Sequence, residues 1–337
     1  MKKVTLDDIA KKLDISKSLV SRALSNKYGV SEEVKLLVKQ TAYEMNYKGQ
    51  QQIDFSGTVS NISSITVLLT KYDFGDANYY SKIIAGIENS AKQKNISLLI
   101  SLIDSDEIIT NFNNTNGIII IGRVSYEQII KIKESKLPTV LVDCCYYSSK
   151  DLDTVMADNF YGCYSAVNYA VSLGHKNIAF VGDPNYSTSF VERHRGFCEA
   201  VKDSTAPINP FYITEKYDDL QTPLCVSQLK KILSSDNRPS ICVCANDSTA
   251  TLVYKIAASL NINIPNELSV IGFDNIHKCD WLTPTLTTVY VPMSEIGRSA
   301  VILLIDRIQN FNAPARHLQV GTYIKIRKSS IRLSNDN

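Results

Sequence analysis

The sequence lacks the signals of membrane insertion and export. No run of apolar residues is long enough to cross a bilayer. Lys2 and Lys3 resemble the start of a signal peptide, but Thr5, Asp7 and Asp8 stand where its apolar region should follow. We therefore expect a cytoplasmic protein.

The sequence also lacks the spacing of metal-binding and disulfide-rich proteins. None of its 8 cysteines forms a C-x-x-C pair, and its 4 histidines show no metal-ligand spacing. Cys242 and Cys244 fall in an apolar run, where reduced cysteine behaves as a small hydrophobic residue. The sequence thus predicts no metal site, no disulfide framework and no cofactor.

Common catalytic motifs are missing as well. No G-x-G-x-x-G follows a predicted strand, and neither G-x-x-x-x-G-K-[ST] nor G-x-S-x-G occurs. No pair of acidic residues has a spacing typical of general acid–base chemistry. We therefore expect a protein that is not an enzyme.

What the sequence does have is a distinctive N-terminal segment, residues 4–24, with the pattern of two short helices joined by a tight turn. Thr5 and Ser16 stand where each helix would be capped, and Asp7 and Asp8 lie where the helix dipole favours negative charge. One face is apolar at helical spacing: Leu6, Ile9, Ala10, Leu13, Leu19, Val20, Ala23 and Leu24. The outer face of the second helix carries Lys17, Ser18, Ser21 and Arg22. Such a helix suits the major groove of DNA.

A third helix and a local excess of positive charge support this interpretation. Ser31 would cap the third helix, which directs these residues inward: Val34, Leu37, Val38, Ala42 and Met45. Residues 1–49 contain ten Lys and Arg against six Asp and Glu, a net charge of +4, whereas the whole chain carries +2. Concentrated positive charge is the electrostatic signature of phosphate binding. We predict that this head binds DNA; a helical hairpin with merely solvated charges is the alternative.

Beyond the head, the sequence has the alternating pattern of an α/β protein. Its 337 residues and 44% hydrophobic content are enough for more than one buried core. The polar, Gln- and Ser-rich stretch 48–64 predicts a linker. Predicted strands follow at 65–70, 96–102, 117–121, 139–142, 177–181, 241–245 and 268–272. Predicted helices lie at about 79–94, 125–135, 159–173, 189–202, 222–234, 247–260 and 293–309. The pattern favours two lobes of doubly wound parallel sheets.

Polar residues gather at the ends of these predicted strands, where ligands of open α/β sheets bind. They are Asp73, Asp143, Asp183, Asn246, Asp247, Asp274 and Asn275. With Tyr79, Tyr80 and the arginine-bearing segment 187–197 they suit a polyhydroxylated ligand, because carboxylates accept hydroxyl hydrogens and an aromatic ring covers the apolar face of a sugar. Any one of them, such as Asp247, can instead cap the following helix.

Several longer motifs carry a family resemblance. In the head they are residues 4–10, Val-Ser-Arg-Ala-Leu at 20–24, and segments 30–34 and 45–47. In the rest of the chain they are 84–88, 173–182, 193–197, 245–247, Val-Ile-Gly-Phe-Asp-Asn at 270–275, 286–289 and 296–298. Over nearly its whole length the sequence resembles the lactose/galactose repressor (LacI/GalR) family of transcriptional regulators.

The resemblance implies a helix-turn-helix head, a hinge, and a two-lobed core similar to periplasmic sugar-binding proteins. It also implies homodimers, some paired into tetramers, on pseudo-palindromic double-stranded operators. Because the family's chain crosses between lobes three times, each lobe is discontinuous. We assign 1–48 to the head, 49–64 to the hinge, 65–158 with 290–320 to the N-subdomain, 159–289 with 321–332 to the C-subdomain, and 333–337 to a tail.

The resemblance also assigns roles to individual positions. Residues matching the base-reading positions are Lys17, Ser18 and Arg22, and those matching phosphate contacts are Thr5, Ser16 and Ser21. Effector-binding positions correspond to Tyr79, Tyr80, Asp143, Ser189, Arg193, Leu220, Asn246 and Asp274. Leu220 departs from the family, because many members have an aromatic residue there.

The hinge departs further from the family pattern. Family members usually carry a small helix, Pro-Asn-x-x-Ala-Arg-x-Leu, whose leucine enters the minor groove. Residues 49–56 contain neither the proline, the Ala-Arg pair nor the leucine. Ile53 or Phe55 can serve as the wedge, because insertion needs only an apolar side chain of suitable shape. A disordered tether is the alternative.

Taken together, the sequence predicts a dimeric, sequence-specific transcriptional regulator, a repressor, controlled by a small ligand between the core lobes. Two alternatives from other classes are a sugar-binding transport protein and an α/β enzyme. A neutral sugar, sugar acid, sugar phosphate or nucleobase would each fit the predicted ligand site.

Overall fold

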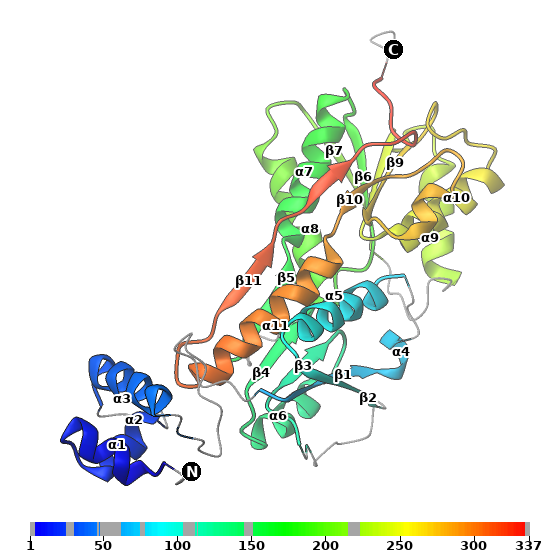
Figure 1. Ribbon diagram of the computed structural model, residues 1–337. Helices are drawn as coiled ribbons and strands as arrows, with labels where there is room; N and C mark the ends of the chain where they lie inside the picture. Colours follow the sequence, from blue (N-terminus) through cyan, green and yellow to red (C-terminus); the bar gives the residue numbers. More distant parts are fainter. Residues whose placement is uncertain are drawn as a thin grey trace. The chain divides into compact units, whose positions relative to one another are not determined.

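The computed structural model describes residues 4–24, 30–45, 47, 62–74, 78–103, 112, 114–144, 151–214 and 223–333 (Figure 1). The chain divides into two compact units. One contains Met1–Ser63 with Ile305–Asn312, and the other Ser64–Leu304 with Ala313–Asn337. Among the described residues, none of the helices combines the length and the apolar character that a membrane span requires.

The N-terminal head is a three-helix module of α1 (Leu6–Leu13), α2 (Lys17–Leu24) and α3 (Glu32–Glu44). Asp14 ends α1 in the left-handed region with φ 53°. Ser16 Oγ accepts a hydrogen bond from the backbone N–H of Leu19 at 3.1 Å, which confirms the predicted cap of α2. At α1, Thr5 is the N-cap residue, as predicted, and forms a capping box with Asp8, whose Oδ2 accepts hydrogen bonds from the Thr5 backbone N–H and hydroxyl, both at 2.7 Å.

The three helices enclose a small apolar core. It consists of Ile9, Ala10, Val20, Ala23, Val38 and Ala42, all buried. Most residues of the predicted apolar stripes belong to this core or pack against it. Leu37 was expected in the core but is 53% exposed, because α3 turns it away from the face that Val38 and Ala42 bury. Helix periodicity alone did not distinguish the orientation of Leu37 from that of the neighbouring Val38.

The second unit contains two six-stranded sheets, and we call the part built on each sheet a lobe. The first lobe has the strand order β11-β5-β4-β3-β1-β2, and all its described pairs are parallel. Its strands are β1 (Ser64–Thr70), β2 (Ser97–Ile103), β3 (Ile118–Ile121), β4 (Thr139–Val142), β5 (Asp153–Ala157) and β11 (His317–Val320). Its part of the sequence also forms α4 (Lys71–Phe74), α5 (Tyr80–Gln93), α6 (Tyr126–Glu134) and α11 (Met293–Gln309).

The second lobe has the order β12-β10-β9-β8-β6-β7, with only β12 antiparallel among its described pairs. Its strands are β6 (Asn177–Val181), β7 (Asn209–Ile213), β8 (Ile241–Cys244), β9 (Ser269–Asp274), β10 (Thr287–Tyr290) and β12 (Tyr323–Lys325). Its helices are α7 (Asn159–Ser172), α8 (Thr188–Asp203), α9 (Pro223–Leu233), α10 (Asp247–Ser259) and the short 3₁₀ helix η2 (His277–Asp280).

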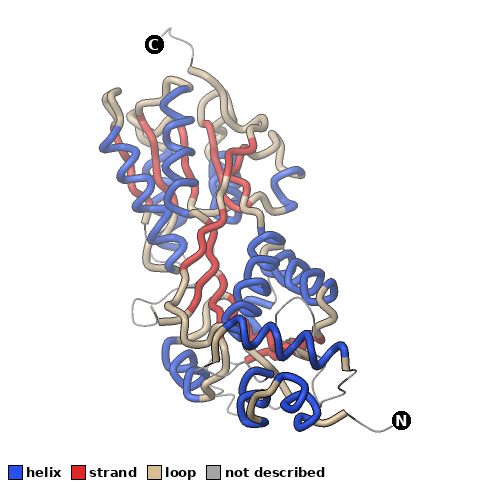
Figure 2. The backbone as a smooth tube through the Cα atoms, turned by 60° about the vertical axis from the view of Figure 1, so that its left-hand side comes forward, coloured by secondary structure: helices blue, strands red, loops and turns tan. Residues whose placement is uncertain are grey.

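The chain passes between the two sheets at three places: between β5 and α7, between β10 and α11, and between β11 and β12. Figure 2 shows the strands in red with helices around them. Each sheet thus draws on chain segments that are distant in sequence. The central strands are buried along their length, as the apolar runs predicted. The subdomain boundaries assigned from the sequence stay a prediction.

Several short elements were not predicted. β5 was missed because Asp153 and Thr154 interrupt its apolar pattern, although both are buried. β7 lies at a sheet edge, where Pro210 is tolerated and most side chains are exposed. β10 is Thr-rich, and its Thr287 and Thr288 side chains are buried with hydrogen-bond partners.

Two glycines let α5 and α11 cross with their backbones in contact. A Cβ on Gly86 would meet the backbone carbonyl of Ser294, and one on Gly297 would meet that of Ile83. Because a backbone carbonyl cannot rotate away as a flexible side chain does, any larger residue forces the helices apart.

We therefore expect Gly86→Ala to lower the free energy of unfolding by about 1–3 kcal/mol, the usual cost of overpacking. Gly321→Ala is the matched control, because nothing lies within 4 Å of its added Cβ. Urea unfolding of the two variants measures the difference. Equal midpoints for both variants would contradict the close helix contact.

Candidate nucleic-acid interface and ligand cleft

The outer face of α2 is as polar as the sequence predicted. Lys17, Ser18, Ser21 and Arg22 are all exposed, while Val20 and Ala23 on the opposite face are buried. The predicted phosphate-contacting residues Thr5 and Ser16 are exposed too. The head therefore presents six of the predicted DNA-binding residues to solvent. Ile53 and Phe55 lie outside the described residues.

One of these residues already has a partner within the head. Lys17 Nζ forms a salt bridge with Asp7 Oδ2 at 2.9 Å, and both side chains are more than half exposed. Such an exposed pair is weak, since water and salt screen it. The ammonium can therefore exchange Asp7 for a DNA group at little cost.

In the second unit, Arg193 on α8 is the most constrained of the predicted ligand-binding residues. Its guanidinium donates from Nε to Asn159 Oδ1 at 2.9 Å, from Nη1 to the Ala245 carbonyl at 2.6 Å, and from Nη2 to Asp274 Oδ1 at 2.9 Å. It also lies over the Phe273 ring at 3.8 Å from the centroid. With 3% of its surface exposed, the side chain is held in one position.

Asp274 ends β9 in an unusual backbone conformation, with φ 106°. Burial raises the pKa of its carboxyl group to about 8, against the lowering effect of the Arg193 charge. The nearby carboxylates of Asp247 and Asp143 raise the pKa of Asp274 further. Burial and mutual repulsion thus both oppose ionisation of these carboxyl groups, and the cleft disfavours further negative charge.

Asp143 follows β4 in the first lobe and joins groups from both lobes. Its Oδ1 accepts a hydrogen bond from Ser189 Oγ on α8 at 3.0 Å, and its Oδ2 accepts one from the Tyr80 hydroxyl at 3.4 Å. Burial raises the pKa of Asp143. Tyr79 packs edge-on against Tyr80, with ring centroids 5.1 Å apart, and both are buried. Tyr79, Tyr80, Asp143 and Ser189 are thus brought together, as predicted.

Asn246 and Asp247 exchange the roles that the sequence favoured. Asn246 Oδ1 caps α10, accepting hydrogen bonds from the backbone N–H and the hydroxyl of Thr249, both at 2.8 Å. Asp247 was offered as a helix cap; its carboxylate instead accepts hydrogen bonds from Ile276 N at 2.9 Å and Thr288 Oγ1 at 2.6 Å. Asp247 is buried and ties β9 and β10 to the start of α10.

Two further predicted positions, Asp183 and Leu220, are not placed in the ligand cleft by any described contact. Asp183 Oδ1 accepts a hydrogen bond from the backbone N–H of Asn185 at 2.8 Å, a local turn contact. Leu220 lies outside the described residues. Among the described residues, no group of three or more His, Cys, Asp or Glu is arranged to hold a metal ion.

Sequence reasoning missed two residues beside the cleft. Asn159 is fully buried; besides accepting from Arg193, its Nδ2 donates to Ala157 O at 3.2 Å and to Glu192 Oε2 at 3.0 Å. It follows β5, a strand that was itself missed. Arg123 lies two residues after β3, where the strand-end rule already applied to Asp143 would have found it.

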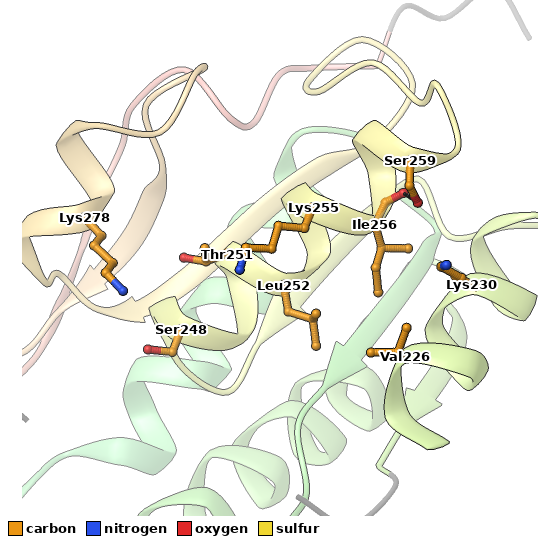
Figure 3. A pocket seen from close by; sticks show the side chains of 9 residues that line it. All are labelled: Val226, Lys230, Ser248, Thr251, Leu252, Lys255, Ile256, Ser259 and Lys278. Carbon is orange, nitrogen blue, oxygen red and sulfur yellow. Dashed lines mark hydrogen bonds between the residues drawn. The ribbon is translucent and has the colours of Figure 1, made fainter. Parts of the chain in front are cut away.

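A separate groove of about 460 Å³ lies between α9 and α10 (Figure 3). Val226 and Leu252 point toward each other across it, and Lys230, Lys255 and Lys278 stand around it. None of the predicted effector-binding residues that the structure describes lines this groove. It is therefore distinct from the cleft at the strand ends.

Comparison with known proteins identifies both parts of the chain. Residues 5–50 match the family of bacterial regulatory proteins, lacI family. Residues 167–330 match the periplasmic binding protein-like domain. The two matches correspond to the head and to much of the two-lobed unit.

Individual relatives extend over the whole chain. The HTH-type transcriptional repressor PurR of Photorhabdus laumondii is 27% identical over 336 residues, 97% of each chain. That of Pasteurella multocida is 27% identical over 334 residues, 96% of this chain and 98% of its own.

Solved structures share the fold. A LacI family regulator from Enterococcus faecium with bound ribose is 26% identical, with a TM-score of 0.67 over 81% of this chain and 100% of its own. The Lac repressor dimer bound to operator and an anti-inducer is 19% identical, with a TM-score of 0.65 over 98% of this chain and 100% of its own. The chain therefore combines a head of the lacI family of bacterial regulatory proteins with a periplasmic binding protein-like domain, as a DNA-binding transcriptional regulator controlled by a small ligand.

Proposed function

We propose that the chain is a cytoplasmic repressor that binds a pseudo-palindromic operator as a homodimer and answers to a neutral sugar bound between its lobes. It has no catalytic role in this proposal. The observation that carries the DNA-binding part is the exposed polar face of α2, whose opposite face is buried in the head. A rigid helix holds such side chains in a fixed arrangement against base edges.

Within the head, Lys17, Ser18 and Arg22 would read base edges, while the other exposed residues would contact phosphates: Thr5, Ser16 and Ser21. Arg and Lys are the usual partners of guanine in the major groove. Two heads on one dimer would read half-sites about 34 Å apart, one turn of the double helix.

For this function we expect Arg22→Ala to lower affinity for a selected operator by about five- to 150-fold, the range of about 1–3 kcal/mol for one base-specific contact. Binding to scrambled duplex should change far less, because phosphate contacts dominate it. Competition gel shifts measure both. Lys11→Ala, which removes one exposed charge from α1, is the matched control. Unchanged specificity in Arg22→Ala would exclude this residue as a base reader.

The ligand part of the proposal follows from the charges of the cleft. Arg193 is already committed to Asp274, Asn159 and the Ala245 carbonyl, whereas Asp143 takes hydrogen bonds from hydroxyl groups only among the described contacts. A sugar acid or phosphate would add charge beside buried carboxylates, which is costly. A neutral polyol donates hydroxyl hydrogens to them instead.

The relatives are consistent with this choice. The Enterococcus faecium regulator holds ribose, and a structural neighbour, the regulator CelR, is a complex with cellobiose. We therefore assign the sugar to a set of residues at the strand ends and take ribose as the first probe. The set is Tyr79, Tyr80, Asp143, Ser189, Arg193, Asn246 and Asp274; Leu220 stays a prediction.

We expect Asp143→Asn to abolish the thermal shift caused by ribose. It should also change the pH dependence of stability, because burial raises the pKa of Asp143 above its ordinary 3.8. The folded chain then holds a proton that the unfolded chain has lost, so the free energy of unfolding falls as pH rises above about 4. Removing the carboxyl group removes this fall. The stability of the variant relative to the wild type should therefore increase as pH rises.

The matched control is Asp151→Asn. Lys133 lowers the pKa of Asp151 through a hydrogen bond of 2.6 Å, so the sign of the pH effect reverses. Ribose binding should survive in this variant. Denaturant unfolding across pH and differential scanning fluorimetry test both variants, and a normal ribose response of Asp143→Asn would exclude the assigned cleft.

The dimer part of the proposal is supported by exposed apolar side chains. β2 is an edge strand, and its Leu99 and Ile100 are 57% and 40% exposed. Trp281, just after η2, is 81% exposed. Edge strands and contiguous apolar surfaces favour association with a second copy. Whether dimers pair into tetramers stays a prediction.

Leu99→Asp should therefore convert the dimer into a monomer at micromolar concentration, since a charge would be buried in the interface. Ile130→Asp is the control, because Ile130 is 39% exposed but lies on α6 rather than on the edge strand. Sedimentation velocity distinguishes the two states. A dimer that persists in Leu99→Asp would show that β2 lies outside the interface.

A further inference from the structure

Arg123, in the first lobe, is fixed by hydrogen bonds to Asp73, a buried carboxylate of the same lobe. Asp73, which lies in α4 just after β1, is 1% exposed. Its Oδ2 accepts a hydrogen bond from the backbone N–H of Arg123 at 2.8 Å. Its Oδ1 accepts hydrogen bonds from Nε at 3.3 Å and Nη2 at 3.2 Å of the same arginine. Both the backbone and the guanidinium of Arg123 are thus fixed to the end of β1.

The same guanidinium reaches the other lobe. Its central carbon lies 4.8 Å from the ring centroid of Tyr186, on the segment between β6 and α8. That ring in turn contacts Phe190 of α8 at a centroid distance of 5.0 Å. A cation over an aromatic face is attracted to it, and more strongly where water is partly excluded. The Arg123 side chain is 33% exposed, so its environment is intermediate.

This contact lies next to the ligand cleft. Gly122, which precedes Arg123 with φ 74°, is so tightly placed that a Cβ would lie 2.6 Å from Asp73 Oδ2 and 3.1 Å from Cζ of Tyr80. The Tyr80 hydroxyl, in turn, bonds Asp143. Gly122, the residue before Arg123, thus packs against both Asp73 of the anchor and Tyr80 of the proposed ligand site.

We propose that Asp73, Arg123 and Tyr186 form a clasp, a cation–π contact anchored on a buried carboxylate, which holds the two lobes together beside the cleft and opens to admit the ligand. The ligand part of this inference rests on the proposed function. The clasp itself is a property of the unliganded chain. An exposed cation–π contact shifts an opening equilibrium by about two- to fivefold.

The first test needs no ligand. In the full chain, Tyr186→Leu removes the aromatic face, whereas Tyr186→Phe keeps it. We expect hydrogen exchange of segments 122–125 and 183–190 to accelerate about two- to fivefold in Tyr186→Leu and to stay at the wild-type rate in Tyr186→Phe. Faster exchange at 122–125 is decisive, because that segment belongs to the opposite lobe.

Tyr186→Leu also changes the contact between Tyr186 and Phe190. A variant that lacks the Arg123 cation distinguishes loss of the clasp from this local effect. Arg123→Gln removes the cation but keeps an amide that can donate to Asp73. In this background, Tyr186→Leu should cause no further acceleration at 122–125. If the exchange rates of Tyr186→Leu and Tyr186→Phe agree, or if the leucine effect persists in the Arg123→Gln background, the clasp is wrong.

The second test uses ribose as the probe. A gate that is closed in both the free and the bound chain changes rates rather than affinity. We expect Tyr186→Leu to raise the association and dissociation rate constants together by about two- to fivefold, with their ratio within about twofold of wild type. Stopped-flow titration measures both. A change in dissociation alone would make Tyr186 a ligand contact instead of a gate. If the wild type does not bind ribose, the ligand assignment fails, while hydrogen exchange still decides the clasp.

Discussion

The burial of one arginine sets the geometry on which the cleft depends. A guanidinium that is 3% exposed persists only if its donors find acceptors, because an unpaired buried charge is far too costly. Arg193 meets this demand with three groups from three chain segments: Asn159 at the lobe crossover, the carbonyl that follows β8, and Asp274 at the end of β9. The strand ends of the second lobe are therefore held in register by a side chain of the proposed ligand site.

The two functional surfaces work by different physics. The face of α2 is exposed, so in its proposed role its charges would act through base contacts and through release of counterions, and the affinity would depend on salt. The cleft is buried, so its groups act through hydrogen bonds fixed in advance, as between Ser189 and Asp143. A ligand in the cleft alters DNA binding only by its different affinity for two states of the chain, and DNA must alter ligand affinity by the same factor.

The sequence predicted those parts of the molecule in which local pattern and tertiary environment agree. Buried central strands and amphipathic helices of the head have this property, and so does the polar face around Arg22. Prediction failed where tertiary contacts decide. Asp153 interrupts a strand pattern yet is buried, because its Oδ1 accepts from the Arg316 backbone 163 residues away. Asn159 and the true role of Asp247 depend on equally distant partners, which no local periodicity reveals.

The salt bridge between Lys17 and Asp7 shows how the free head can remain ready for DNA. An exposed pair of this kind contributes about 0–1 kcal/mol, whereas a good base contact discriminates by about 1–3 kcal/mol. The exchange therefore favours DNA at a matching base and is close to neutral at a mismatched one. Phosphates near the head would also repel the Asp7 carboxylate, weakening the internal pair as the duplex approaches. Because the pair is weaker than a good base contact, Lys17 can leave Asp7 at a matching site at little cost, and the pair otherwise holds the free side chain in place.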